Sequence, residues 1–408
     1  MKKNTTHVFK YKENGKKTIK IEFQQPLLID LFQDKNSELY IELLKNVMTK
    51  SKRVVAFVGA GISTGAGIPD FRSRTGLFAS LRSDFKLKTT GQELFDISVY
   101  KVKKSDENIQ QFHKMISNLY RISASAKPTL FHQYIAALAR SSRLMRLYTQ
   151  NIDFLETRIP CLESQVPLPV APPWPKTIQL HGGLQNMICS KCCWTGPFDP
   201  DIFQDDTLPN CQQCIEMENV RTIAGKRNVG VGKLRPRIVL YNEHNLDSEA
   251  IGQVTTYDLK EKPDALIVAG TSLKIASARR IVREMIEAVK ASHGVTIWIN
   301  ISDFPKTKEL EDKFDIIVKG DCEKIANLVM SKNDTADTNS KESCYVLNSS
   351  SSQIKRPFME NVLSDNKNAS TINVPCHDSK KRRVLKTQPK ISKIFKSTKP
   401  IKNEKSVK

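Results

Sequence analysis

Apolar residues recur along the chain in short runs that favour β-strands. These runs cover residues 54–58, 144–149, 177–180, 237–241, 265–269, 295–300 and 315–318. Helical periodicity separates most of them, and it is clearest over residues 108–122, 129–141 and 276–291. Because strands alternate with helices, the pattern predicts the α/β fold class, with a doubly wound, Rossmann-like parallel sheet.

Two stretches interrupt this alternation. Residues 77–125 are mostly helical and lack the strand of a simple crossover, whereas residues 182–235 are polar, rich in turns and contain cysteines. We expect both to be insertions that together build a smaller lobe beside the sheet, with a ligand-binding cleft between the lobes. The catalytic domain is predicted to span residues 51–330.

The two ends of the chain carry less information. Residues 1–50 are predicted to form an N-terminal extension with no legible chemistry, containing a hairpin around residues 13–15 and a helix from about Ser37 to Met48. After residue 330 the sequence becomes rich in Ser, Asn and Lys and loses its periodicity. Residues 331–408 are therefore predicted to be a disordered basic tail.

Charge and cysteine content restrict the class of protein. The net charge is +21, and residues 380–408 alone hold twelve Lys and Arg against one Glu. A basic tail indicates an acidic partner such as nucleic acid, or a nuclear-import receptor. There is no apolar run of about 18 residues and no apolar segment near the start, so we expect neither a membrane span nor secretion. Nine cysteines, an odd number, favour a reduced environment in which clustered thiols bind metal.

A glycine loop follows the first predicted strand of the sheet. Gly59, Ala60 and Gly61 come directly after residues 54–58, as in a dinucleotide site, where glycines permit positive φ and let a pyrophosphate approach main-chain N–H groups. The full GxGxxG pattern is absent, because Thr64 stands at its third glycine position. By itself, the loop is equally consistent with a glycine-rich turn.

Polar residues follow two further strands. Gln150, Asn151 and Asp153 come after residues 144–149, where they could bind a ribose hydroxyl and a carboxamide, although Asn and Asp are also good helix N-caps. His181 closes the strand at 177–180 and precedes two glycines. A lone histidine is more often structural, yet an unperturbed pKa of about 6.5 suits proton transfer. His132 lies in an apolar helical segment and is interpreted as structural.

Four cysteines have the spacing of a zinc ribbon. Two CxxC pairs are separated by eighteen residues and comprise Cys189, Cys192, Cys211 and Cys214, with Cys193 leaving some ambiguity of register. A zinc ion held by four thiolates is coordinatively closed, so it should brace the small lobe and take no part in chemistry. Nucleic-acid binding by such a ribbon remains an alternative.

Several motifs in this order resemble the sirtuin family of NAD-dependent protein-lysine deacylases. They are GAGISTGAGIPDFRSRTG from Gly59, YTQNID from Tyr148, LHGG from Leu180 and GTSL from Gly270. The resemblance covers about residues 50–330. RPRIVLYNE from Arg235, PPWPKTIQLHG and the basic tail resemble the fungal nuclear branch that deacetylates histones.

The resemblance implies a role for each motif. Ala60, Asp70 and Arg72 would contact NAD, and Phe71 would shield the reacting ribose. Gln150 would bind the ribose, Asn151 and Asp153 would form the nicotinamide pocket, and His181 would be the general base. The remaining implied contacts to NAD, which reach its phosphates and its adenine end, are Gly59, Gly61, Gly270, Thr271, Ser272, Asn300 and Cys322.

The same resemblance implies the reaction and its substrate. NAD would be consumed, with release of nicotinamide, free lysine and O-acetyl-ADP-ribose. The acetyl-lysine peptide would add as a strand at Val239, Tyr241 and Asn242. Two departures concern this pocket, because Tyr241-Asn242 replaces the usual Phe-Gly and Phe154 stands where the family often has glycine. We expect Asn242 to preserve the turn, since Asn tolerates positive φ.

The implied target is acetylated histone in the nucleus, specifically a core lysine of histone H-three. The alternatives are a chromatin or replication scaffold without turnover, and an enzyme that transfers ADP-ribose to protein.

The tail contains two further short motifs. Lys380 to Arg383 form a basic cluster typical of nuclear-import signals. Gln388, Ile391, Ile394 and Phe395 resemble the box by which replication proteins dock on the sliding clamp, with Ile394 at a position that usually holds an aromatic residue. A plain disordered tail is the alternative to clamp binding.

Overall fold

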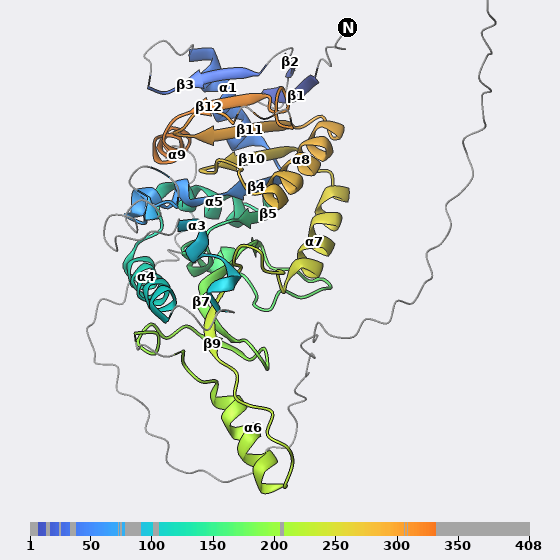
Figure 1. The fold of residues 1–408 in the computed structure, drawn as a ribbon. Helices are drawn as coiled ribbons and strands as arrows, with labels where there is room; N and C mark the ends of the chain where they lie inside the picture. The colour runs from blue at the N-terminus through green and yellow to red at the C-terminus, as the bar shows by residue number, and fades with distance from the viewer. Residues whose placement is uncertain are drawn as a thin grey trace, which may run out of the picture. The chain divides into compact units, whose positions relative to one another are not determined.

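In a computed structural model of the chain, seven parallel strands form one sheet (Figure 1). The structure describes residues 7–13, 17–23, 26–32, 38–71, 73, 76–77, 91–100, 106–204, 208–305, 307 and 309–331. In spatial order the strands are β3 (Leu27–Asp30), β12 (Ile316–Lys319), β11 (Val295–Asn300), β10 (Ala265–Ala269), β4 (Val54–Val58), β5 (Leu144–Thr149) and β6 (Thr177–Gln179). The predicted doubly wound sheet is therefore confirmed.

Side chains of the central strands alternate between two buried faces. Val54, Ala56 and Val58 of β4 pack in one core, whereas Val55 and Phe57 pack in another. Because both faces are covered, these strands are apolar at every position, which explains the continuous apolar runs of the sequence.

Helices cover both faces of the sheet. The first core includes residues of α1 (Glu38–Lys50), α5 (Leu130–Arg140) and α9 (Cys322–Met330). The second includes residues of α7 (Ser248–Lys260) and α8 (Ala276–Ala291). His132 lies inside α5, where it is fully buried and its Nδ1 accepts the N–H of Thr129, so its predicted structural role is confirmed.

A third core belongs to a smaller lobe. A second sheet of order β8-β7-β9 packs with the helical insertion. The strands are β7 (Gly182–Cys189), β8 (Thr195–Pro197) and β9 (Leu234–Ile238), and the helical elements are α3 (Gly91–Leu94), η3 (Ile97–Tyr100) and α4 (Asp106–Ser125). Helix α6 (Gln212–Ile223) extends from this lobe away from the main sheet (Figure 1).

Two expectations about these elements are wrong. The apolar run at 237–241 is not a strand of the parallel sheet, because β9 ends at Ile238 and pairs antiparallel with β7. Residues 27–50 are not a separate extension, since β3 pairs with β12 and Leu44, Val47 and Met48 of α1 are buried in the first core. An edge strand of four residues is too short to be recognised from its own pattern.

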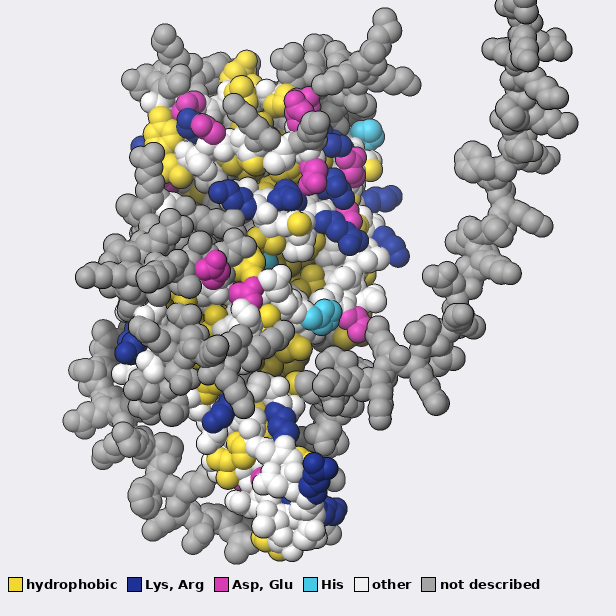
Figure 2. Space-filling view, viewed as in Figure 1, with side chains coloured by type: hydrophobic (Ala, Val, Ile, Leu, Met, Phe, Trp, Pro, Cys, Tyr) yellow, Lys and Arg dark blue, Asp and Glu magenta, His cyan; other side chains and the backbone are white. Residues whose placement is uncertain are grey.

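The N-terminal hairpin is confirmed by the pairing of β1 (His7–Glu13) with β2 (Lys17–Phe23). The predicted tail from residue 332 onward lies outside the described residues. On the face seen in Figure 2, Lys and Arg side chains gather around α8 and around the lobe that carries α6. No helix in the described part of the chain is long and apolar enough to cross a membrane.

Candidate functional site

The carboxyl ends of the parallel strands β4, β5, β10 and β11 define the candidate site. The chain runs outward from β4 through β5 to β6, and then returns to the other side of β4 with β10, β11 and β12. The order of strands therefore reverses between β4 and β10. Ligands of open α/β sheets bind at such a switch point, outside the carboxyl ends of the strands.

The glycine loop and the loop after β10 touch at this point. A Cβ on Gly61 would lie 2.6 Å from Cα of Gly270, and one on Gly59 would lie 2.7 Å from Cβ of Thr271. The N–H groups of Gly59 and Gly61 donate to the carbonyl oxygens of Ala269 and Gly270. Of these glycines only Gly270 has positive φ, +63°. Gly59 and Gly61 are thus required for contact between the two loops, whereas their contact with NAD phosphates stays a prediction.

Replacing Gly61 with alanine should destabilise the protein by about 1–3 kcal/mol, because the added methyl group meets backbone that cannot move without shifting β10. The measurement is urea unfolding. Gly252 in α7 is the matched control, since a Cβ there meets nothing within 4 Å. Gly252→Ala should stabilise by about 0.5–1 kcal/mol, through helix propensity alone. Equal effects of the two substitutions would contradict the contact.

Polar side chains from the ends of β5 and β11 converge on Thr271, which follows β10. Nε2 of Gln150 donates to Oγ1 of Thr271 at 2.8 Å, and Nδ2 of Asn300 donates to its carbonyl oxygen at 3.2 Å. Ser272 is half-buried next to it. The structure therefore brings together predicted residues from β5, β10 and β11.

Cys322 begins α9 and is buried. Burial raises the pKa of its thiol to about 12, so the side chain stays protonated and is no nucleophile.

A buried polar network surrounds Asn151. Its Nδ2 donates to Oε1 of Glu156 at 3.0 Å and to Oγ of Ser63 at 3.4 Å. Oγ1 of Thr149 donates to the same oxygen of Glu156 at 2.8 Å. Asn151 is 2% exposed, and its Oδ1 is buried without a hydrogen-bond partner among the described residues. A buried acceptor of this kind is available to a donor from outside the protein.

Glu156 was not predicted from the sequence, and neither was Ser63. Glu156 is fully buried, and an acidic residue directly after the apolar pair Phe154-Leu155 is the one signal that points to it. Burial raises the pKa of Glu156 to about 8, and the charge of Asp153 adds to the rise. Burial also raises the pKa of Asp153, against hydrogen bonds from Ser63 and from the N–H of Leu155.

The raised pKa of Glu156 predicts a pH-dependent stability. The native state holds a proton that the unfolded chain has already released, so this contribution is fully present below about pH 4.5 and is lost as the pH rises through about 8. The side chain of Glu156→Gln does not titrate. The free energy of unfolding of this variant should therefore rise relative to that of wild type by more than about 1 kcal/mol between pH 5 and pH 8. Urea unfolding at the two pH values measures this, with the exposed Glu163→Gln as control. A difference that does not change with pH would contradict the assignment.

The residues around Asp153 form a turn that uses the left-handed region. Phe154 has φ of 51°, is buried, and its ring lies 5.5 Å from that of Tyr120. Positive φ explains why a glycine suits this position. No α-helix begins here, because the next element is the 3-10 helix η4 (Glu156–Arg158), which has no side-chain cap. The helix N-cap interpretation of Asn151 and Asp153 is therefore wrong.

The predicted loop over the ribose is described only in part. The carboxylate of Asp70 accepts the N–H of Ser73 at 2.8 Å, and the ring of Phe71 packs edge-on against Phe95 at 5.7 Å. Arg72 lies outside the described residues. Phe71 therefore joins this loop to the aromatic core of the small lobe.

His181 lies where the two lobes meet. It stands between β6 and β7, is half-buried, and its carbonyl oxygen accepts the N–H of Val239 at 2.9 Å. Tyr241 pairs with the helical insertion instead, since its N–H donates to the carbonyl of Phe95 at 2.7 Å. Asn242 has φ of 60°, which confirms that the turn is preserved. The histidine is thus in direct backbone contact with Val239, a residue predicted to bind the substrate peptide.

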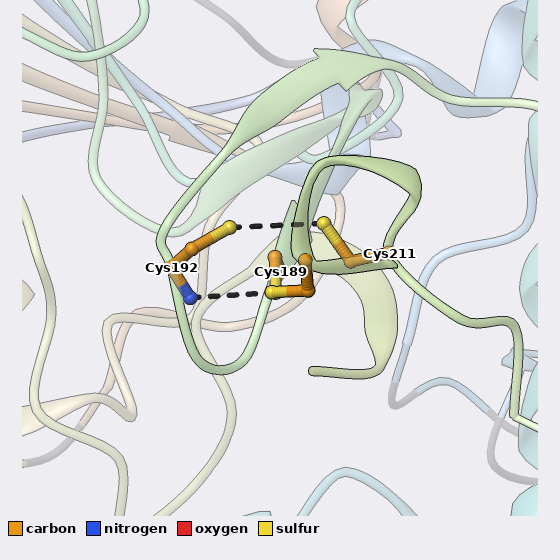
Figure 3. A group of neighbouring side chains, drawn as sticks. Cys189, Cys192 and Cys211 are labelled. Atoms are coloured by element: carbon orange, nitrogen blue, oxygen red, sulfur yellow. Dashed lines mark hydrogen bonds between the residues drawn. The ribbon is translucent and has the colours of Figure 1, made fainter. Parts of the chain in front are cut away.

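The four predicted cysteines form one cluster. Figure 3 shows three of them, Cys189, Cys192 and Cys211. Their sulfur atoms lie within 4.8 Å of one another, and the pairs Cys189/Cys214 and Cys192/Cys211 are each 3.7 Å apart. A tetrahedral zinc site with Zn–S distances of 2.3 Å requires sulfurs about 3.75 Å apart. The N–H groups of Lys191 and Cys192 also point to Sγ of Cys189, at 3.3 and 3.4 Å. The geometry therefore fits a closed zinc site, and Cys193 is not part of it.

Two features define a Rossmann-like nucleotide-binding protein with a structural metal site. They are the switch point of the sheet with its buried amide oxygen, and a lobe that carries a cluster of four cysteines. The Sir2 family model matches residues 59–277. The NAD-dependent protein deacetylase hst4 of Schizosaccharomyces pombe is 49% identical over 288 residues, which are 71% of this chain and 68% of that protein. The chain belongs to the Sir2 family.

Other relatives agree with this assignment. The NAD-dependent histone deacetylase HST4 of Saccharomyces cerevisiae is 43% identical and aligns with 68% of this chain and 75% of its own length. The NAD-dependent protein deacetylase hst4 of Emericella nidulans is 47% identical over 73% of this chain. The chain spans 49% of the length of that relative.

Solved structures share the fold. A Sir2 homolog in complex with NAD has a TM-score of 0.51 at 24% identity, covering 71% of this chain and 92% of its own. A Sir2 structure with a p53 peptide and NAD has a TM-score of 0.50 at 24% identity, covering 71% and 96%.

Proposed function

We propose that this protein is an NAD-dependent protein-lysine deacetylase. The observation that carries the proposal is the buried Oδ1 of Asn151, which has no hydrogen-bond partner among the described residues. Asn151 follows β5 and contacts Ser63 in the loop after β4, next to the switch point of the sheet. An acceptor in this position fits the N–H donors of a nicotinamide carboxamide. The names of the relatives, NAD-dependent protein and histone deacetylases, support the same activity.

The residues of the site would have distinct roles in binding NAD. Bound NAD would supply a ribose carbon that loses nicotinamide and accepts the acetyl oxygen. Gln150 and Asn300, which both donate to Thr271, would bind NAD together with Thr271 along the carboxyl ends of β5, β10 and β11. Asn151 and Asp153 would hold the nicotinamide.

His181 would accept a proton from the ribose. Val239, whose N–H donates to the carbonyl of His181, would place the acetyl-lysine strand beside it. This backbone hydrogen bond would keep the substrate strand and the histidine in register.

The proposed substrate is an acetylated histone, and the finer proposal is a core lysine of histone H-three. The histone deacetylase activity named for the relatives in yeasts supports the first statement and a nuclear site of action. Docking on the sliding clamp through Gln388, Ile391, Ile394 and Phe395, and nuclear import through Lys380 to Arg383, rest on the sequence alone, since these residues lie outside the described part of the chain.

The proposal is tested by incubating the purified protein with NAD and acetylated histone peptides. We expect one nicotinamide released for each lysine deacetylated, with O-acetyl-ADP-ribose as the second product. No turnover would favour a scaffold, and ADP-ribose attached to protein would favour a transferase.

A further inference from the structure

Glu156 is a fully buried acidic residue that contacts Asn151 of the proposed nicotinamide pocket. It begins η4, three residues after Asp153, and is 0% exposed. One of its oxygens, Oε1, accepts from both Thr149 and Asn151, at 2.8 and 3.0 Å. Loss of either contact would leave a buried polar atom of Thr149 or Asn151 without this partner, which is costly.

These contacts determine which way the amide of Asn151 points. Because Oε1 accepts from Thr149, it carries no proton whether Glu156 is ionised or protonated on Oε2, so it must face the NH₂ of Asn151 and not the oxygen. Ser63 lies on the same side, 3.4 Å from Nδ2. The amide oxygen is consequently turned away from both residues, and it is the buried atom without a partner among the described residues.

Thr149 hydrogen-bonds to both Asn151 and Glu156 and so holds the two residues in place. Its hydroxyl accepts the backbone N–H of Asn151 at 3.0 Å and donates its own proton to Glu156 at 2.8 Å. A hydroxyl has one proton to donate, so a contact to the backbone N–H directs that proton to the carboxylate. The backbone and the side chain of Asn151 are therefore both tied to the Thr149–Glu156 pair.

We infer that Glu156 is a positioning residue that holds the amide of Asn151 with its oxygen toward the bound dinucleotide, and thereby selects a leaving group that carries an N–H donor. The inference rests on the proposed function. Glu156 touches no substrate itself, and it acts through Asn151.

The test compares two variants of the full-length protein. Glu156→Gln keeps an oxygen that accepts from Thr149 and Asn151, whereas Glu156→Leu has a similar size but no acceptor, so the amide is free to rotate. The exposed Glu163→Leu is the control. The probes are NAD and its 3-acetylpyridine analogue, which has a methyl ketone in place of the carboxamide and lacks the N–H donors.

The readouts are the dissociation constants of both dinucleotides by calorimetry and their kcat/KM values. Wild type, Glu163→Leu and Glu156→Gln should prefer NAD to a similar extent. Glu156→Leu should lose about tenfold of that preference, because a rotated Asn151 offers NH₂ to the ketone oxygen of the analogue. A general loss of structure would weaken both ligands and leave their ratio unchanged.

An unchanged ratio in Glu156→Leu, or an equal loss in Glu156→Gln, would overturn the inference. If Glu156→Leu does not fold, Thr149→Val removes one of the two contacts and should shift the ratio in the same direction by a smaller factor, and no shift would overturn it. Wild type that binds NAD but deacetylates no peptide would refute the proposed function, while calorimetry would still decide the role of Glu156.

Discussion

Replacing His181 with alanine is expected to lower NAD-dependent deacetylation by about 10²- to 10⁴-fold, the range for loss of a general base. His181 stands directly between β6 and β7, and its backbone carbonyl accepts the N–H of Val239 at 2.9 Å. That hydrogen bond is made by the backbone and survives in the variant. The loss should therefore appear in kcat with little change in the KM of the peptide. The measurement is steady-state nicotinamide release with an acetylated peptide.

The matched control is His293→Asn. His293 is exposed after α8 and has φ of 55°, which asparagine tolerates. This variant should retain wild-type activity, and both variants should keep the melting temperature of wild type. A His181→Ala enzyme with more than about a tenth of the wild-type rate would exclude proton transfer by this residue.

Replacing Cys211 with serine is expected to remove zinc from the protein and to unfold the small lobe. Cys211 is fully buried and lies 3.7 Å from Cys192. Structural zinc contributes on the order of 10 kcal/mol to the folding of small metal-binding units, more than the net stability of most domains. We expect about one zinc ion per chain in wild type and almost none in the variant. Metal analysis measures the content, and hydrogen exchange over residues 182–238 measures the lobe.

Cys161→Ser is the control for this prediction. Cys161 is half-buried near α5, outside the cluster of four cysteines. Its substitution should leave both zinc content and exchange unchanged. Full zinc content in Cys211→Ser would show that the cluster does not bind the metal as a unit.

Loss of zinc should also reduce activity, although the cysteine cluster is far from the proposed general base, His181. Strand β7 has His181 directly before its first residue and Cys189 as its last. At about 3.3 Å per residue, the two ends of the strand are more than about 20 Å apart. Zinc would thus influence catalysis through the position of β7 and of β9, whose Ile238 pairs with Gly182 next to His181.

Sequence reasoning located most of the fold because local patterns specify it. Residues 54–58 and 265–269 are buried on both faces, so each is an uninterrupted apolar run with the length of a strand. The CxxC pairs also predicted the metal site directly, since two ligands three residues apart can reach one metal in almost any loop. The motifs around Gly59, Gln150, His181 and Gly270 pointed to the family by their order alone.

Other features depend on contacts between residues far apart in the chain, so only the tertiary structure decided them. Leu27–Asp30 became part of the sheet because its N–H and carbonyl groups pair with Ile316–Lys319. Residue 61 must be glycine because a side chain there would clash with Gly270, which is more than 200 residues away in the chain. No pattern in the loop itself reveals this contact. Glu156 acquired its raised pKa and its hold on Asn151 through burial, and burial is a property of the packed molecule and not of the segment that contains the residue.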